Sequence, residues 1–189
     1  MTKKIDLRVL KTKKAIKEAF LSLVKEKSYS KITVKDIVEE ALINRNTFYL
    51  HYLDKDDLLD KLTSECMDRL DASMNSVEEV SQISELSYEG FKTINDRMFM
   101  AIKEDYDFYK VVLGDESIPY LSVKFHNVIR NHIGVGMEKE RAFYIEYLVS
   151  GLVGIIKLWI RDPEKYSIDE VSKLLINIHS TDMIDLLSK

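Results

Sequence analysis

Apolar side chains recur at helical spacing along most of this 189-residue chain, and few helix-breaking residues interrupt them. The chain holds only two prolines and six glycines, while 46% of its residues are hydrophobic. No stretch alternates apolar and polar residues over more than a few positions, as a half-buried strand would. We therefore predict an all-α protein with short connections, long enough to bury a sizeable core.

The helical pattern can be followed from end to end. A basic arm at residues 1–8 precedes a first helix at 9–27, and a polar break is predicted at 75–81. Asp54 and Ser167 are predicted N-caps, and Glu170 would complete a capping box with Ser167. Besides two short helices described next, we predict helices at 55–74, 83–103, 106–113, 118–133, 138–161 and 168–187.

Residues 33–55 carry the most distinctive pattern. One short helix is predicted from an apolar stripe at Val34, Ile37, Val38 and Ala41, with Thr33 as its cap and Asp36 completing a capping box. A polar break at Asn44 leads to a second short helix at residues 45–52. The buried face of that helix is predicted to be only Phe48 and Tyr52. Two short helices joined by a tight turn, the second rich in hydrogen-bonding side chains, are typical of a helix-turn-helix that reads the DNA major groove.

This part of the chain resembles the DNA-binding domain of the TetR family of bacterial transcriptional regulators. The resemblance covers residues 12–62 and rests on residues 32–37, Ala41, residues 47–52 and residues 55–59, all in register. Residues 151–160, with small side chains before Trp159, are similar to the dimerisation region of one branch of that family. Leu42 departs from the glycine usual in the turn, where a positive φ is often needed, so the turn either strains this leucine or closes differently.

The resemblance implies which side chains contact DNA. Arg45 has the donors for guanine O6 and N7, Asn46 can pair with adenine, and Tyr49 can meet a thymine methyl or a phosphate. His51 is assigned to a phosphate contact. The alternative is a surface histidine whose hydrogen bonds are already satisfied. The base-edge candidates are Lys35, Asn44, Arg45, Asn46 and Tyr49, and the phosphate candidates are Thr33, Thr47, His51 and Lys55.

Charge is divided unevenly along the chain. Residues 1–53 hold 12 Lys and Arg against 6 Asp and Glu, although the whole chain has a net charge of -4. A basic module facing phosphate and an acidic remainder would produce this asymmetry. Solvation of a helix face by the lysines near the N-terminus is the alternative.

The predicted helix at 138–161 is apolar on nearly every face from Phe143 onward. Such a helix must be buried on all sides, and a second copy of the chain is the natural cover for one of them. Together with the last helix it would form a four-helix dimer interface. A central core helix in a monomer is the alternative. The predicted interface residues are Tyr147, Ser150, Gly151, Gly154, Leu158, Val171, Leu175 and Ile178.

Aromatic and methionine side chains in the middle of the chain suit either an adaptable ligand pocket or an ordinary core. The pocket candidates are Phe91, Met98, Phe99, Tyr109 and Phe125. The sequence shows no HExxH motif, no histidine pair with zinc-ligand spacing and no phosphate-binding glycine loop, so we predict neither an enzyme nor a metal or other cofactor. The single cysteine, Cys66, is expected to be a small buried hydrophobe.

These patterns together predict a helix-turn-helix domain at residues 1–54 and a helical ligand-binding and dimerisation domain at 55–189. The predicted function is a cytoplasmic transcriptional regulator, a repressor that binds a palindromic operator in double-stranded DNA as a homodimer, without membrane association. The resemblance implies release by a small-molecule effector. Alternatives are a TetR-like co-activator or adaptor whose main partner is another protein, and a small-molecule carrier.

Overall fold

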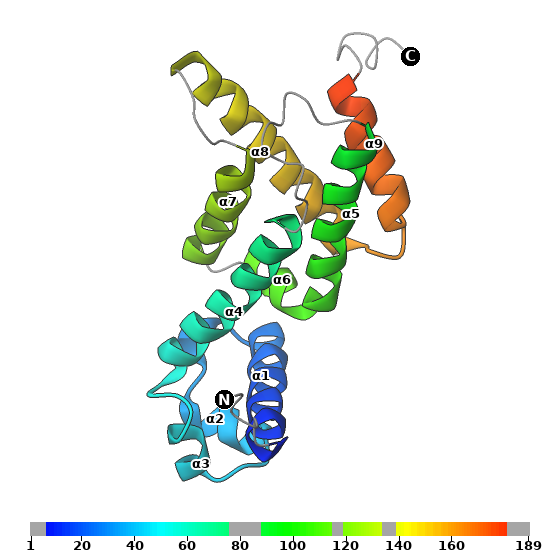
Figure 1. Cartoon of the computed structure of the whole chain (residues 1–189). Helices are drawn as coiled ribbons and strands as arrows, with labels where there is room; N and C mark the ends of the chain where they lie inside the picture. The colour runs from blue at the N-terminus through cyan, green and yellow to red at the C-terminus, as the bar shows by residue number, and fades with distance from the viewer. Residues whose placement is uncertain (1–6, 76–87, 115–118, 134–138, 181–189) are drawn as a thin grey trace, which may run out of the picture. The chain divides into compact units, whose positions relative to one another are not determined.

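The computed structural model describes residues 7–75, 88–114, 119–133 and 139–180 (Figure 1). Within these ranges all regular elements are helical, which confirms the predicted all-α class. The elements are α1 (Leu7–Glu26), η1 (Tyr29–Lys31), α2 (Val34–Glu40), α3 (Arg45–Tyr49), α4 (Lys55–Asn75), α5 (Tyr88–Glu104), α6 (Tyr106–Leu113), α7 (Pro119–Ile133), α8 (Lys139–Arg161) and α9 (Ile168–Ser180).

The helix bounds agree with the sequence pattern to within a few residues, and α6 has the predicted bounds. One difference is α3, which ends at Tyr49 instead of residue 52. The basic arm, the break at 75–81, the beginning of the helix predicted at 83 and the end of the last helix lie wholly or partly outside the described residues. No helix in the described part of the chain is long and apolar enough to cross a membrane.

The chain divides into two compact units, Met1–Glu65 and Cys66–Lys189. The division falls inside α4, so this helix contributes its first half to one unit and its second half to the other. The domain boundary suggested by the sequence, between residues 54 and 55, coincides with the beginning of α4.

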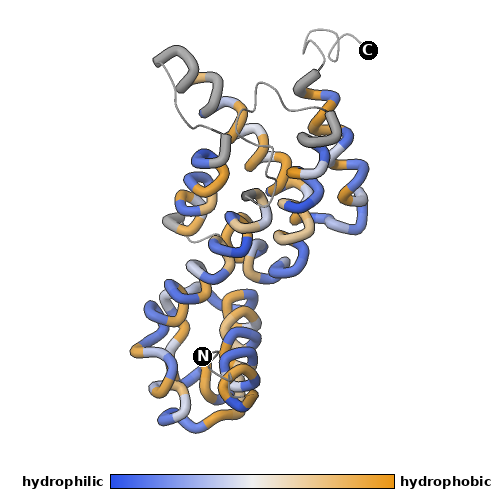
Figure 2. The backbone as a smooth tube through the Cα atoms, viewed as in Figure 1, coloured by the Kyte–Doolittle hydropathy of each residue, from blue (hydrophilic) through white to orange (hydrophobic). Residues whose placement is uncertain are grey.

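The core of the first unit forms where α1 to α4 turn their apolar faces inward. Hydrophobic and hydrophilic positions alternate along α1, as its helical period requires (Figure 2). The side chains that pack together are fully or almost fully buried: Ile16, Phe20, Ile37, Phe48, Tyr52, Leu58 and Leu62. Asp54 caps α4, because its Oδ1 accepts from the backbone N–H of Asp56 and Asp57 at 2.9 and 2.8 Å, which confirms the predicted N-cap.

The second unit is a helical bundle around buried aromatic side chains. Phe99 of α5 meets Trp159 of α8 edge to face, with ring centroids 5.3 Å apart. α5 and α9 lie side by side (Figure 1) and are joined at their surface by Lys92, whose ammonium contacts Asp96 at 2.7 Å and Asp169 at 2.9 Å. The predicted capping box of α9 is confirmed, with Glu170 N–H donating to Ser167 Oγ and both Ser167 donors bound to Glu170 Oε2.

Candidate nucleic-acid interface

The predicted capping box is present at the beginning of α2. Thr33 Oγ1 accepts from Asp36 N–H at 3.2 Å, while the backbone N–H and the hydroxyl of Thr33 both donate to Asp36 Oδ2 at 2.8 Å. Lys27, just after α1, adds an ion pair to the same carboxylate at 3.0 Å. These donors lower the pKa of Asp36 to about 2, chiefly through the Thr33 hydroxyl. The hydroxyl predicted to hold phosphate is thus already engaged in the cap of α2.

The turn between α2 and α3 closes as a Schellman motif. Ile43 N–H donates to Val38 O at 3.0 Å and Leu42 N–H donates to Glu39 O at 3.2 Å. Leu42 has φ 53°, so this leucine occupies the left-handed conformation that glycine adopts without cost. Of the two alternatives raised by the sequence, the strained leucine is therefore the one adopted. Its side chain is 92% exposed.

Helix α3 begins with a second local cap. Asn44 Oδ1 accepts from Asn46 N–H at 2.9 Å, so the amide predicted to meet a base serves as the N-cap of α3. An asparagine directly before a short helix is a common N-cap, and this signal was present in the sequence. The inward side of α3 is anchored by Phe48, which is completely buried, and by Tyr52 just beyond the helix, both as predicted.

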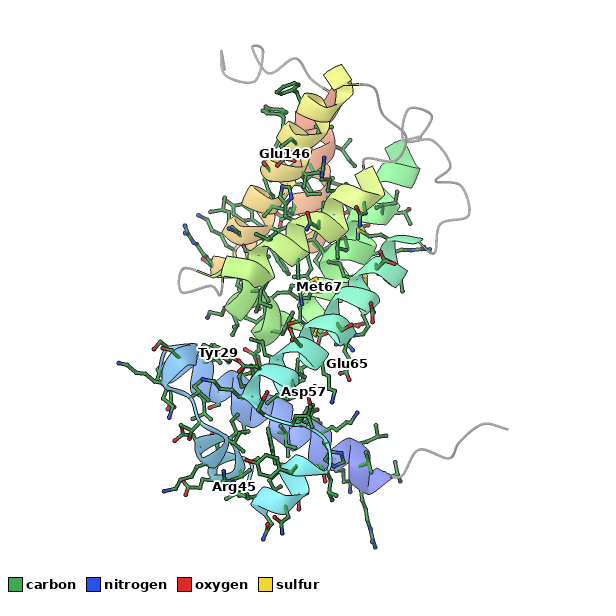
Figure 3. All side chains as sticks on the ribbon, turned by 90° about the vertical axis from the view of Figure 1, so that its left-hand side faces the viewer. Tyr29, Arg45, Asp57, Glu65, Met67 and Glu146 are labelled. Carbon is green, nitrogen blue, oxygen red and sulfur yellow. The ribbon has the colours of Figure 1, made fainter. Side chains whose placement is uncertain are left out.

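The outward side of α3 is a polar surface formed by Arg45, Asn46 and Tyr49, all exposed. Arg45 Nη2 and Nε lie 3.1 and 3.3 Å from the Tyr49 hydroxyl, one helical turn further on. Figure 3 shows Arg45 on the surface of α3. We call Arg45, Asn46 and Tyr49 the reading face, because their donors and acceptors are directed away from the core.

The remaining DNA candidates lie around this face. Lys35 is exposed on α2, and its Nζ lies 3.8 Å from Glu39 Oε1. Thr47 on α3 and His51 just after this helix are half-buried. His51 also provides a carbonyl oxygen to Lys61 Nζ at 3.1 Å. The ammonium of Lys35 is thus accessible on the surface of α2.

Lys55 is placed differently from a surface phosphate ligand. Its ammonium donates to the carbonyl oxygens of Tyr29 at 3.0 Å, Ile32 at 2.9 Å and, more weakly, Ser30 at 3.4 Å. It also lies 4.6 Å from the centroid of the Tyr29 ring, and the Tyr29 hydroxyl donates to Asp56. Lys55 therefore ties α4 to η1. Sequence reasoning missed this contact, because it joins residues more than twenty positions apart.

Of the eight predicted dimer residues, six are exposed and two are buried. Tyr147, Ser150, Gly151, Gly154 and Leu158 form an exposed line along α8 at spacings of three and four, and Phe143 extends this line. Val171 and Leu175 of α9 are instead 4% and 1% exposed, packed inside the chain. The outward apolar positions of α9 are Leu174 and Ile178. We define the α8 stripe as Phe143, Tyr147, Ser150, Gly151, Gly154 and Leu158.

Four of the five predicted pocket residues are buried in the second unit. Met98, Phe99, Tyr109 and Phe125 are each at most 1% exposed, and the side chain of Phe91 lies outside the described residues. Tyr109 stacks edge to face on Phe125, and its hydroxyl donates to the carbonyl oxygen of Cys66 at 3.0 Å. Cys66 is itself buried, as the sequence indicated.

Comparisons with known proteins agree with this geometry. Residues 16–62 match the family model described as bacterial regulatory proteins, tetR family, and residues 89–181 match a transcriptional regulator C-terminal region of the same family. An uncharacterized HTH-type transcriptional regulator, YxbF of Bacillus subtilis, is 47% identical over 58 residues, which span 30% of this chain and 15% of that protein.

Solved structures extend the likeness to nearly the whole chain. A TetR transcriptional regulator from Streptococcus agalactiae is 25% identical with a TM-score of 0.61, covering 90% of this chain and 94% of that one. The dihydroxyacetone kinase operon activator DhaS shares the fold, with 20% identity, a TM-score of 0.57 and coverage of 88% and 93%. With both ends of the chain matched and a helix-turn-helix in place, the protein belongs to the TetR family of transcriptional regulators and is not an enzyme.

Proposed function

We propose that this protein binds a palindromic operator as a homodimer, with one reading face in each of two successive major grooves. The observation that carries this proposal is the reading face itself. Its three polar side chains are exposed on a helix whose opposite side is anchored by the buried Phe48. An arginine and an asparagine presented together can pair with guanine and adenine edges.

Charge supports the same partner. The first 53 residues carry a twofold excess of basic over acidic residues, so this part of the chain is attracted to phosphate. Lys35 can contribute to this attraction, because it is exposed on α2. Phosphate contacts of this kind set the register, while the reading face selects the sequence.

The α8 stripe supports association of two copies. Tyr147 and Leu158 are 60% and 62% exposed, and Phe143 is 81% exposed, which leaves a line of large apolar side chains in water. Between them, a Cβ added at Gly151 or Gly154 would meet nothing within 4 Å, so a partner helix can approach the backbone closely there. Two-fold pairing through the stripe would cover this surface in both copies.

The regulatory outcome we propose is repression, because a dimer seated across an operator excludes other proteins from that DNA. Release by a small molecule requires an effector that binds the DNA-free conformation more tightly than the DNA-bound one. Met98, Phe99, Tyr109 and Phe125 are each at most 1% exposed, so an effector that contacts them would have to enter the interior of the second unit.

The direct test is selection of bound sequences from a pool of random duplexes with the full chain. We expect an inverted repeat whose half-sites are about one helical turn apart, roughly 34–36 Å between centres. The affinity for the selected duplex should fall steeply with salt, because bound phosphates release counterions. Recovery of unrelated sequences only would refute the proposal.

An adaptor that works through another protein is the second candidate. The exposed α8 stripe favours it as much as it favours a homodimer, since a different protein could cover the same side chains. Light scattering of the purified protein separates the two. A stable dimer supports the operator-binding proposal, whereas a monomer that binds DNA without a salt-dependent, sequence-selective component supports the adaptor.

A further inference from the structure

Leu50, directly after α3, is a large apolar side chain beside the reading face, and its side chain is 80% exposed. Its backbone still follows the helix, with φ -68° and ψ -20°, and its N–H donates to Asn46 O at 3.2 Å. Residues four apart on a helix are neighbours on one side of it. Leu50 therefore lies next to Asn46, on the side opposite the buried Phe48.

The surroundings of Leu50 point to DNA as the surface that covers it. Asn46 and Tyr49, its neighbours on α3, present hydrogen-bonding groups away from the core, and Arg45 adds positive charge one turn earlier. A protein partner of ordinary apolar character would leave these polar groups without water or partners. The major groove instead offers hydrogen-bonding base edges and one apolar group, the thymine C5 methyl.

We propose that Leu50 is a specificity-determining residue that packs against a thymine methyl beside the base read by Asn46. This inference rests on the proposed operator binding and gives Leu50 an apolar contact beside the hydrogen bonds of the reading face. A thymine methyl in contact with Leu50 is removed from water. Burial of one such group changes the affinity for DNA about fourfold per half-site. The result is a preference for thymine over cytosine and uracil at one position in each half-site.

The experiment uses the operator obtained by selection with the full chain. Each thymine is replaced in turn by uracil, which removes the C5 methyl and keeps every hydrogen-bonding group. Binding of the wild type and of Leu50→Ala is measured for each duplex by fluorescence anisotropy. We expect one position per half-site at which uracil weakens the wild type, by about 15-fold when both half-sites are changed. Leu50→Ala should not distinguish thymine from uracil at that position.

Two further variants make the comparison specific. Met100→Ala truncates an apolar side chain of α5 that is 57% exposed, and it should keep the wild-type uracil profile. Tyr49→Phe should still bind more weakly when uracil replaces the thymine assigned to Leu50, because this variant retains both the aromatic ring at position 49 and Leu50. Thermal unfolding of Leu50→Ala should match that of the wild type, since the side chain contributes little to the core.

The outcomes separate the inference from the function on which it rests. If the wild type selects a palindrome and Leu50→Ala has the same uracil profile, the assignment of Leu50 is wrong while operator binding stands. The assignment is also wrong if no uracil weakens the wild type, or if Leu50→Ala loses dimerisation instead of thymine preference. If the wild type selects no sequence, both the inference and the proposed function fall.

Discussion

The guanidinium of Arg45 donates to the hydroxyl of Tyr49 across one turn of α3, with Nη2 3.1 Å from that oxygen. The guanidinium carbon also lies 5.6 Å from the centroid of the tyrosine ring. Because both side chains are exposed, the contact adds little to stability. Its consequence is orientation, since it restricts a flexible arginine to the reading face before DNA arrives.

The first prediction concerns this pair. Arg45→Ala should weaken binding to the selected operator by at least about 30-fold in the dimer, because a bidentate contact to guanine is lost in each half-site. Tyr49→Phe should have a smaller effect, since it removes only the hydroxyl that orients Arg45. Fluorescence anisotropy with the operator measures both. Arg130→Ala, which removes a half-exposed arginine of α7, is the control and should bind like the wild type. Unchanged affinity in Arg45→Ala would contradict the reading-face assignment.

The second prediction separates two roles for Lys55. Lys55→Met keeps the aliphatic stem but removes the donors to the Tyr29 and Ile32 carbonyl oxygens, so we expect a loss of about 1–3 kcal/mol in the free energy of unfolding. Lys14→Met is the matched control, because Lys14 is exposed and only weakly paired with Glu18. Denaturant unfolding without DNA measures the difference. If Lys55 served only to bind phosphate, Lys55→Met would leave the free energy of unfolding unchanged and would instead reduce the salt dependence of DNA binding.

The third prediction uses backbone conformation. Leu42→Gly should raise the free energy of unfolding by about 0.5–1 kcal/mol, because relief of the left-handed strain exceeds the conformational entropy that glycine adds to the unfolded chain. Leu50→Gly should change it in the opposite direction by about 1 kcal/mol, since Leu50 has helical φ and ψ. Both leucines are highly exposed, so packing contributes little to either change. A loss of stability in Leu42→Gly would contradict the assigned strain.

Comparison of sequence and structure shows where local rules were sufficient. The caps at Thr33, Asp54 and Ser167 depend on groups within three residues, and each was predicted correctly. Asn44 obeys the same rule, since its amide oxygen accepts from the backbone N–H of Asn46 two residues on. Local hydrogen bonds of this kind can therefore be predicted from sequence alone.

Contacts between distant residues could not be predicted in this way. The Lys55 ammonium reaches the carbonyl oxygens of Tyr29 and Ile32 because α4 packs against η1. The spacing of apolar residues in the sequence does not specify this packing. The apolar pattern of α9 likewise identifies an amphipathic helix, yet it does not show which apolar residues face a partner. Only the packed bundle shows that Val171 and Leu175 point inward while Leu174 and Ile178 remain exposed.

The fourth prediction is a pH dependence that originates at Asp36. Its pKa is lowered from 3.8 to about 2 by the Thr33 hydroxyl, by Lys27 and by the Thr33 backbone. A carboxyl whose folded pKa is depressed stabilises the fold above its unfolded pKa, and this contribution is lost as the pH falls from about 3.8 to about 2. Asp36→Asn should therefore unfold at a lower temperature at pH 5 and lose less stability between pH 4 and pH 2 than the wild type. Glu40→Gln, an exposed change on the same helix, should retain the wild-type pH profile.

The fifth prediction tests the α8 stripe. Leu158→Glu places a charge at a position that is 62% exposed in the single chain, so the folded protomer tolerates it. In a dimer closed through the stripe, the same carboxylate would be buried without a partner, which strongly disfavours association. We expect light scattering to show a dimer for the wild type and a monomer for Leu158→Glu, with equal helical content by circular dichroism.

Val123→Glu, at an α7 position that is 59% exposed, is the matched control for this variant and should remain dimeric. Gly154→Leu provides an independent change, because a side chain at this residue meets open space within one chain but would hold a partner helix away. The operator affinity of Leu158→Glu should fall with its dimerisation, since two linked reading faces bind far more tightly than one. A dimeric Leu158→Glu protein would place the interface elsewhere on the chain, because an unpaired charge buried in the stripe cannot be accommodated without loss of association.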